Sequence, residues 1–375
     1  MTYRSVLLDR PGAVEASGLD TGVAAHYGDP FREQRSLAAG GGIVDQSQRG
    51  VVTVSGPDRL SWLTTLSSQD ISRLAPGDSA ELLLLSIQGR IEYDLHALDD
   101  GERLWLIGEQ AEAAPLAAWL DSMRFMLRVE VADVSAQWGV VASTAELEAA
   151  AVGFGPDGRE LRWSDPWPGV MPGGYAYSVV EGDAHPGAQR RWFEYLVPLD
   201  SLESLMDALA GLTLTGSWAA EALRIAAWRP RWGAETDDLT IPHELDLLRT
   251  AVHLAKGCYK GQETVARVHN LGHPPRRLVF LHLDGSQHTL PAVGSPVMLG
   301  ERRVGILTSV ERHYEMGPIG LAVIKRSVDP MAELSIVDEQ ETYPAAQEVV
   351  VAPDAGQVVG RQTGFLRPAR PATQH

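Results

Sequence analysis

The segment that decides the fold reads Lys256-Gly257-Cys258-Tyr259-Lys260-Gly261-Gln262-Glu263 and continues as Thr264-Val265-Ala266-Arg267. Its two glycines let the backbone take tight or left-handed turns. From Glu263 to Asn270 the residues favour a short helix, which Gly272 ends. We therefore predict a turn that leads into a helix, with Cys258 just before the helix N-terminus.

Cys258 is the only cysteine of the chain, and its neighbours in sequence favour a reactive thiol. The helix dipole and the flanking Lys256 and Lys260 stabilise a thiolate, so an exposed Cys258 should have a lowered pKa. The same two lysines, together with free backbone N–H groups, suit an anion such as a carboxylate. The alternative is that Cys258 is a small buried apolar residue in a turn, which is the commoner fate of a free cysteine.

The composition narrows the class of protein. A single cysteine rules out an internal disulfide and any all-cysteine metal site within one chain. The 375 residues, of which 44% are hydrophobic, suffice for two or three domains or for one large composite domain. A formal net charge of −17 repels phosphate backbones, so direct binding to DNA or RNA is not expected.

The hydropathy of the chain predicts a cytoplasmic protein. The first ten residues contain no long apolar run and no small-residue cleavage pattern. No stretch approaches the roughly 20 apolar residues that are needed to cross a bilayer. We therefore expect no association with a membrane.

The order of the expected helices and strands indicates an α+β protein with antiparallel sheets. Residues 1–30 are polar and are predicted to form an N-terminal arm. Residues 31–275 mix helices with strands, including a strand at 50–56, a meander over 80–107 and a helix at 111–125. Residues 276–345 contain short strands with glycine turns, which is typical of a small antiparallel barrel or sandwich. Residues 346–375 are predicted to be a disordered tail.

A second informative segment is Ser86-Ile87-Gln88-Gly89-Arg90-Ile91-Glu92-Tyr93-Asp94-Leu95, which we predict to be a tight turn and the strand that follows it. Strand alternation places Glu92 and Asp94 on one face. The other face then carries Ile91, Tyr93 and Leu95. A carboxylate on the first face could hydrogen-bond a heterocycle with adjacent N–H donors. The alternative, which the pattern alone favours, is the solvated polar face of a hairpin.

A third segment, residues 221–244, combines charged residues with Trp228 and Trp232. It contains the runs Glu221 to Ile225, Glu235 to Asp238 and Ile241 to Glu244. Such a stretch could line a pocket that has aromatic walls and polar anchors. It could equally form a surface helix and loop.

Several common site motifs do not occur in the chain. There is no Gly-x-Gly-x-x-Gly after a strand, no phosphate-binding Gly-x-x-x-x-Gly-Lys-Ser/Thr loop and no Gly-x-Ser-x-Gly elbow. His269 and His273 have the spacing of a helical zinc site, but Gly272 and Pro274 break the helix and no third ligand is near. We therefore predict no metal site.

Together these segments resemble the YgfZ-type folate-binding family, which is related to the aminomethyltransferase (T-protein) of the glycine cleavage system. Residues 256–263 fit the family pattern K-G-C-Y-x-G-Q-E without a mismatch. Residues 89–95 resemble the T-protein hairpin that carries a functional aspartate, matched here by Asp94. Residues 51–71 resemble the family's strand–helix opening, and residues 304–309 its C-terminal barrel. The resemblance covers roughly residues 40–330.

The resemblance implies a T-protein-like α+β fold of three domains around a central folate cavity, with a C-terminal antiparallel β-barrel. The first two domains would be interleaved within residues 31–275. It implies tetrahydrofolate, or a derivative, as the cofactor. Asp94 and Cys258 are the implied catalytic residues, with Cys258 as a redox or transfer thiol at the cavity mouth. The implied cofactor-binding residues are Asp94, Tyr93, Arg224, Lys256, Gly257, Tyr259, Gly261, Gln262, Glu263 and Arg267.

The function that the resemblance implies is that of a folate-binding accessory protein for the assembly or maintenance of iron–sulfur enzymes, including enzymes that thiolate tRNA. Its partners would be iron–sulfur assembly or client proteins. An alternative is a folate-dependent one-carbon (aminomethyl) transferase. Asp94 supports that reading. Ala226, which stands where the T-protein has a pterin-binding glutamate, and the cysteine motif count against it. A third alternative is a purely structural binding protein with an empty cleft.

Overall fold

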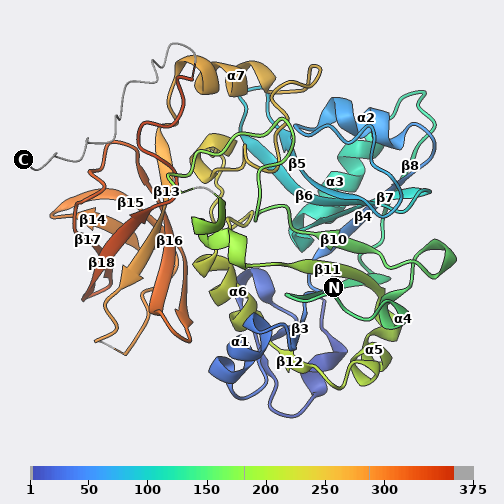
Figure 1. Cartoon of the computed structure of the whole chain (residues 1–375), viewed down its shortest axis with the longest axis horizontal. Coiled ribbons are helices and arrows are strands. Elements are labelled where there is room, and N and C mark those ends of the chain that lie inside the picture. The colour runs from blue at the N-terminus through green and yellow to red at the C-terminus, as the bar shows by residue number, and fades with distance from the viewer. Residues whose placement is uncertain (1–2, 181, 287, 359–375) are drawn as a thin grey trace, which may run out of the picture.

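The computed structural model describes residues 3–180, 182–286 and 288–358. The chain builds two five-stranded sheets and a closed six-stranded barrel, which lie beside one another around a buried centre (Figure 1). The predicted α+β class and the C-terminal antiparallel barrel are both confirmed.

The first sheet has the strand order β10-β11-β9-β3-β12. Its strands are β10 (Arg162–Ser164), β11 (Phe193–Pro198), β9 (Trp138–Ser143), β3 (Gly42–Asp45) and β12 (Thr213–Thr215). All pairs are antiparallel except β12 with β3, which run parallel. The sequence did not predict that parallel pair. The chain leaves this sheet after β3, builds the second sheet, and returns at β9.

The second sheet is fully antiparallel, with the order β5-β6-β7-β4-β8. Its strands are β4 (Gly50–Ser55), β5 (Ser79–Leu85), β6 (Ile91–Asp99), β7 (Arg103–Gly108) and β8 (Glu130–Asp133). Leu82 and Leu84 pack on one side, in the core cluster that includes residues of α2 (Arg59–Leu66) and α3 (Gln110–Met123). Leu83 and Leu85 pack on the other side. The unbroken leucine run therefore forms a strand because both of its faces are buried.

The barrel closes in the order β13-β16-β15-β14-β17-β18. Its strands are β13 (Arg276–Leu283), β14 (Pro296–Leu299), β15 (Arg302–His313), β16 (Gly317–Lys325), β17 (Leu334–Asp338) and β18 (Glu341–Val349). Its interior holds apolar residues such as Val279, Leu307 and Ile336. Leu278, Phe280 and Ile319 instead belong to a cluster shared with Leu83 and Trp228, which joins the barrel to the rest of the molecule.

Helices fill the space between the three sheet structures. The central helix is α6 (Ser217–Ala226), which contacts α1 (Pro30–Ala38), β15 and β16 (Figure 1). The other helices are α4 (Ala149–Val152), α5 (Leu202–Ala208) and α7 (Gln262–Leu271). The 3-10 turns are η1 (Val6–Asp9), η2 (Gly18–Asp20), η3 (Pro156–Gly158), η4 (Gly182–Ala184), η5 (Pro186–Gln189), η6 (Leu199–Ser201) and η7 (Pro242–Leu245).

The two ends of the described chain are packed. The segment before α1 contains the pair β1 (Val14–Glu15) and β2 (Ala24–His26), and Leu7 and Val23–Ala25 are buried. At the other end, Val351 pairs with Ser178, and Val350 is fully buried. The predicted disordered tail is therefore wrong for residues 346–358, because they finish β18 and then bury apolar side chains. Residues 359–375 lie outside the described part.

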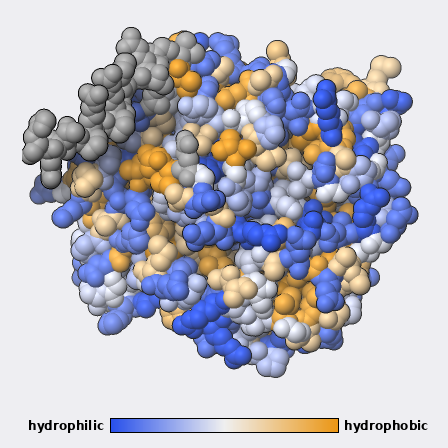
Figure 2. Space-filling view, in the orientation of Figure 1, coloured by the Kyte–Doolittle hydropathy of each residue, from blue (hydrophilic) through white to orange (hydrophobic). Residues whose placement is uncertain are grey.

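The surface is hydrophilic with scattered apolar groups on the face that Figure 2 shows. Exposed apolar side chains such as Ile87, Phe125 and Met331 lie in three separate loops. Among the described residues, no helix combines the length and the apolar character that a membrane span needs.

Candidate functional site

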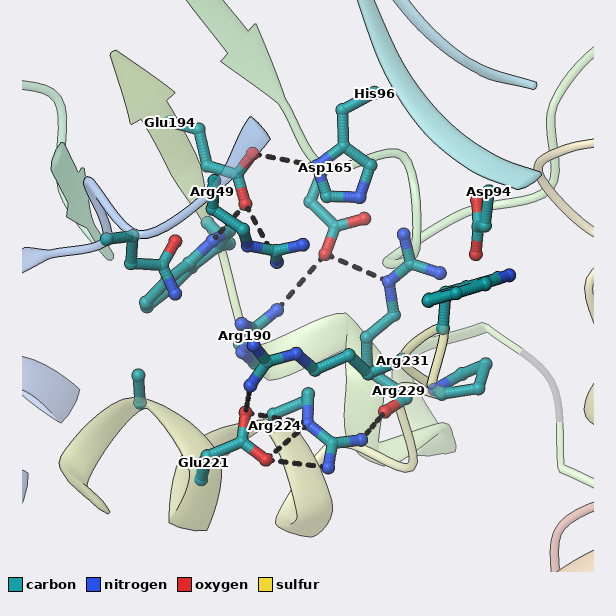
Figure 3. Close-up of a pocket in the computed structure, with 15 residues that line it drawn as sticks. Arg49, Asp94, His96, Asp165, Arg190, Glu194, Glu221, Arg224, Arg229 and Arg231 are labelled. Atoms are coloured by element: carbon teal, nitrogen blue, oxygen red, sulfur yellow. Dashed lines mark hydrogen bonds and ion pairs between the residues drawn. The ribbon is translucent and has the colours of Figure 1, made fainter. Parts of the chain in front are cut away.

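Buried charged side chains from both sheets and from α6 surround a small cavity at the centre of the molecule (Figure 3). Its volume is about 40 Å³, which is room for a few water molecules. The charged residues that line it are Arg49, Asp94, His96, Asp165, Arg190, Glu194, Glu221, Arg224, Arg229 and Arg231. Of the sequence-predicted ligand residues, Asp94 and Arg224 meet here.

Arg224 on α6 uses its whole guanidinium group within the protein. It pairs with Glu221 at 2.8 Å and with Glu235 at 2.9 Å. It also donates to Ser309 Oγ on β15 at 2.7 Å and to the Arg229 carbonyl at 2.7 Å. Arg224 therefore ties α6 to the barrel as well as lining the cavity.

Glu194 and His96 form a hydrogen-bonded pair in the cavity wall. The His96 Nδ1 atom lies 2.7 Å from Glu194, and the His96 ring stacks on Trp163 at 3.7 Å between ring centroids. Burial alone would raise the pKa of Glu194, but His96 and Arg49 outweigh it and lower that pKa to about 2. Glu194 is therefore a carboxylate under all ordinary conditions.

A bulge in β6 changes which residues share the face of Asp94. Leu84 pairs with Tyr93 and Leu85 pairs with Ile91, so Glu92 is an extra residue in the strand. The prediction that Ile91 lies opposite Asp94 is therefore wrong. Ile91 packs in the same apolar cluster as Leu83, the cross-strand partner of Asp94.

The prediction that Glu92 and Asp94 share one face of the strand is also wrong. Glu92 is exposed and binds Lys260 Nζ at 2.9 Å. Asp94 is instead buried beside Glu81 of β5, which lies on the same face of the sheet. Burial first, and then the charge of Glu81, raise the pKa of Asp94.

A ligand-sized cleft of about 750 Å³ opens next to the central cavity. The β5–β6 turn, the start of α3 and residues 232–238 form its walls. Its aromatic residues are Tyr93, Trp119 and Trp232, and its charged residues are Arg90, Glu92, Glu112, Asp237, Asp238 and Lys260. Trp232 lines both the cleft and the central cavity, so it separates the two spaces.

A second cleft, of about 670 Å³, lies on the side of Arg190. Arg190 lines both this cleft and the central cavity. Its wall also contains Trp228, Phe280 and Tyr314. The central cavity thus lies between two larger clefts, with Trp232 towards one and Arg190 towards the other.

The structure packs the cysteine segment directly against the hairpin turn. Gly261 has a φ of +86°, and a Cβ atom there would lie 2.6 Å from the Ser86 carbonyl oxygen and 3.0 Å from Gly89 Cα. Gly89 in turn faces Thr264. The two segments that stand out in the sequence are therefore neighbours in space.

The two lysines beside Cys258 do not form an anion site. Lys256 Nζ donates to the carbonyl oxygens of Thr64, Ser67 and Gln69, the last two at 2.6 and 2.9 Å. Burial lowers the pKa of Lys256 to about 8. Because Lys260 binds Glu92, both ammonium groups already have partners elsewhere, which corrects the prediction made from their sequence positions.

The other residues of the cysteine segment divide into buried and exposed ones. Cys258 and Gly257 are exposed, whereas Tyr259 is buried under Lys256, whose Nζ lies 5.1 Å from the ring centroid. Gln262 donates to the Lys256 carbonyl at 3.3 Å. Glu263 and Arg267 form an exposed ion pair. None of these residues lines the central cavity or the cleft at Trp232.

The two histidines at zinc-like spacing have separate roles. His269 Nδ1 lies 3.1 Å from Tyr177 Oη, and His273 Nδ1 lies 2.7 Å from the Ala355 carbonyl oxygen. Within the described ranges, no three His, Cys, Asp or Glu side chains are grouped in a way that would hold a metal ion.

Sequence reasoning missed several residues of the site: Glu81, Glu112, Asp165, Arg190 and Arg229. Glu81 has a visible signal, since it stands in an apolar strand directly before the leucine run at residues 82–85, and a buried carboxylate needs a partner. The run Arg229-Pro230-Arg231 is a similar signal, because two arginines follow a helix that is otherwise buried. Only the fold shows that these residues meet.

Comparison with known proteins agrees with this architecture. Residues 26–143 match the family model described as the GCVT N-terminal domain. The aminomethyltransferase of Rubrobacter xylanophilus is 28% identical over 301 residues, which cover 78% of this chain and 78% of that protein. That of Symbiobacterium thermophilum is 26% identical over 298 residues, which cover 76% of this chain and 78% of that protein.

A solved structure gives the clearest comparison of the fold. The crystal structure of the glycine cleavage system aminomethyltransferase T from Bartonella henselae matches with a TM-score of 0.71. The match covers 94% of this chain and 96% of that chain, at 18% sequence identity. The chain therefore has the fold of the glycine cleavage T-protein, as its sequence predicted.

Proposed function

We propose that this chain is a cytoplasmic, tetrahydrofolate-binding accessory protein of the YgfZ type, which supports the assembly or maintenance of iron–sulfur enzymes. The observation that carries the folate part is the position of Asp94 and Arg224. Within a T-protein fold, both line the central cavity, which adjoins a cleft of ligand size. The iron–sulfur part is supported by the match of residues 256–263 to the family's cysteine motif.

The dimensions of the two spaces decide where a folate would fit. The central cavity, at about 40 Å³, is too small for a pterin ring, whereas the cleft of about 750 Å³ is in the range of small-molecule sites. Tyr93, Trp119 and Trp232 supply aromatic walls for a planar heterocycle. Arg90 is the cation of the cleft that suits the glutamate carboxylates of the ligand, because Lys260 is already paired with Glu92.

A thermal-shift titration tests the folate part. Tetrahydrofolate should raise the melting temperature, because a ligand that binds only the folded state stabilises it by mass action. Trp232→Ala should weaken binding by about tenfold, since it removes an aromatic wall of the cleft. The matched control is Trp218→Ala, which removes a half-exposed tryptophan of α6 that lines none of these spaces. Equal affinity in both variants would place the ligand elsewhere.

A complementation experiment tests the iron–sulfur part. Cells that lack this chain should lose activity of iron–sulfur enzymes, and the wild-type chain should restore it. Cys258→Ala should fail to restore it, because the exposed thiol is the one group of the segment that can react with a partner. Full restoration by Cys258→Ala would refute a role for the thiol.

One observation favours a second candidate function, a folate-dependent aminomethyl transferase. Three relatives that align with 76–84% of this chain are named aminomethyltransferases. That function predicts formation of methylenetetrahydrofolate from an aminomethyl donor, and loss of this turnover in Asp94→Asn. Absence of turnover with a chain that binds tetrahydrofolate would favour the accessory role.

A further inference from the structure

We infer that Glu81 holds Asp94 in its uncharged form, so that Asp94 presents a neutral carboxylic acid, and not a carboxylate, to the central cavity that adjoins the proposed folate cleft. Glu81 is then a positioning residue for the site, although it does not line the cavity itself. The placement of Asp94 at the ligand rests on the proposed function. The sharing of a proton between the two carboxyl groups does not.

The strand register places the two carboxyl groups side by side. Leu83 pairs with Asp94, and Glu81 pairs with His96, so Glu81 and Asp94 are diagonal neighbours on one face of the sheet. Glu81 is fully buried, and Asp94 is 9% exposed. Two carboxylates held this close in a buried site cannot both ionise without a counter-ion for each.

The nearby cations do not supply a counter-ion for Asp94. Arg229 pairs with Glu81 at 2.7 Å through Nη2 and with Asp165 at 3.3 Å through Nε. Arg190 also pairs with Asp165, at 3.1 Å. Within the described ranges no ion pair reaches Asp94, its Oδ1 atom is buried without a hydrogen-bond partner, and no dashed line reaches it in Figure 3.

A second carboxyl group near Asp94 acts in the same direction as Glu81, and one cation opposes both. Glu112 on α3 adds a second carboxyl group that disfavours a negative charge, and Arg229 is the cation that opposes this effect. His96 is engaged with Glu194 and Trp163. Burial first, and then Glu81, raise the pKa of Asp94. This direction agrees with the geometry, in which Asp94 has a carboxyl neighbour but no ion pair. One proton shared between Asp94 and Glu81, with Arg229 beside them, leaves the group electrically balanced.

This charge state has a chemical consequence. A neutral carboxylic acid offers one donor and one acceptor, which suits the edge of a heterocycle that presents a C=O or ring nitrogen beside an N–H group. A carboxylate offers acceptors only. Asparagine has the shape and the mixed donor–acceptor character of the neutral acid, so Asp94→Asn should preserve binding of such a ligand.

Infrared spectroscopy of the ligand-free protein tests the shared proton. A protonated carboxyl group gives a carbonyl stretch that a carboxylate lacks. At about pH 7 the wild-type spectrum should contain a band that Asp94→Asn removes, and Glu81→Gln should move the loss of this band to a pH lower by about one unit or more. Glu130→Gln, the same change at an exposed position of β8, is the control and should leave the band unchanged.

Two outcomes would overturn the inference. One is a wild-type spectrum in which Asp94→Asn removes no band at about pH 7. The other is a band that titrates identically in wild type and Glu81→Gln. The first comparison does not need the Glu81 variant, so it decides whether the pair of carboxyl groups holds a proton even if Glu81→Gln fails to fold.

Tetrahydrofolate binding then separates this inference from the proposed function. Asp94→Asn should keep the affinity within about threefold of wild type at about pH 7, whereas a carboxylate acceptor would make the same variant lose binding. If the infrared band is found but no folate binds, the proposed function fails and the shared proton stands. If folate binds and the band is missing, the shared proton fails and the proposed function stands.

Discussion

Gly261 is the residue at which the cysteine segment and the hairpin turn touch. Its φ of +86° is a conformation that side chains with a Cβ rarely adopt, and the position has no room for a Cβ atom beside Ser86 and Gly89. We expect Gly261→Ala to lower the free energy of unfolding by about 2 kcal/mol or more, as measured by denaturant midpoints.

The segment supplies its own control for this prediction. Gly257 lies in the same segment, has no positive φ that would strain another residue, and would place a Cβ atom in open space. Gly257→Ala should therefore change stability by no more than about 0.5 kcal/mol. Equal losses in both variants would show that glycine is required in this loop for a reason other than the contact with the hairpin.

At the scale of elements, the start of α3 contains a buried acid. Glu112 Oε2 accepts the backbone N–H of Glu109 at 2.9 Å, while its Oε1 atom is buried without a partner. Burial raises the pKa of Glu112 to about 8. Its unfolded value is 4.5, so the folded protein binds one more proton than the unfolded chain between about pH 4.5 and 8. The carboxyl group therefore lowers stability progressively as the pH rises through that range.

Glu112→Gln should remove this pH dependence. Glutamine keeps an acceptor for the Glu109 N–H but cannot ionise. We expect the variant to equal wild type at about pH 4 and to be more stable by roughly 3 kcal/mol at about pH 7, because each unit of pKa shift corresponds to about 1.4 kcal/mol. Thermal unfolding at both pH values measures it. A gain that is the same at both values would point to packing instead of ionisation.

Helices and strands were predictable from the sequence where hydrophobic periodicity and turn residues decide them. The meander over residues 80–107 corresponds to β5, β6 and β7, and the helix at 111–125 corresponds to α3. The site was less predictable, because a bulge at Glu92 breaks the alternation that placed Asp94. Lys256 failed as an anion ligand for a similar reason, since its partners are carbonyl groups at residues 64–69 that are distant in sequence. Sequence neighbours of a motif need not be its neighbours in space.

At the scale of the whole molecule, buried ion pairs join the separate sheet structures. Glu235 accepts from Thr308 and Ser309 of the barrel while it pairs with Arg224 of α6. Arg231 binds Asp20 of the N-terminal segment, Glu109 at the N-cap of α3 and Glu221 of α6. A single guanidinium group thus connects three parts of the chain that are far apart in sequence, at residues 20, 109 and 221.

Arg231→Gln tests this connection. Removal of the cation leaves two buried carboxylates, Asp20 and Glu109, and the partly buried Glu221 without a shared partner, so we expect a loss of about 3–5 kcal/mol in the free energy of unfolding. The matched control is Arg267→Gln, which breaks the exposed pair with Glu263 and should cost about 0.5 kcal/mol or less. Hydrogen exchange adds the test of scale. Because Arg231 joins separate parts of the chain, the protection of backbone amides from exchange should fall around Ala24 and around Glu109 together. A loss of protection confined to residues next to position 231 would mean that the ion pairs act only locally.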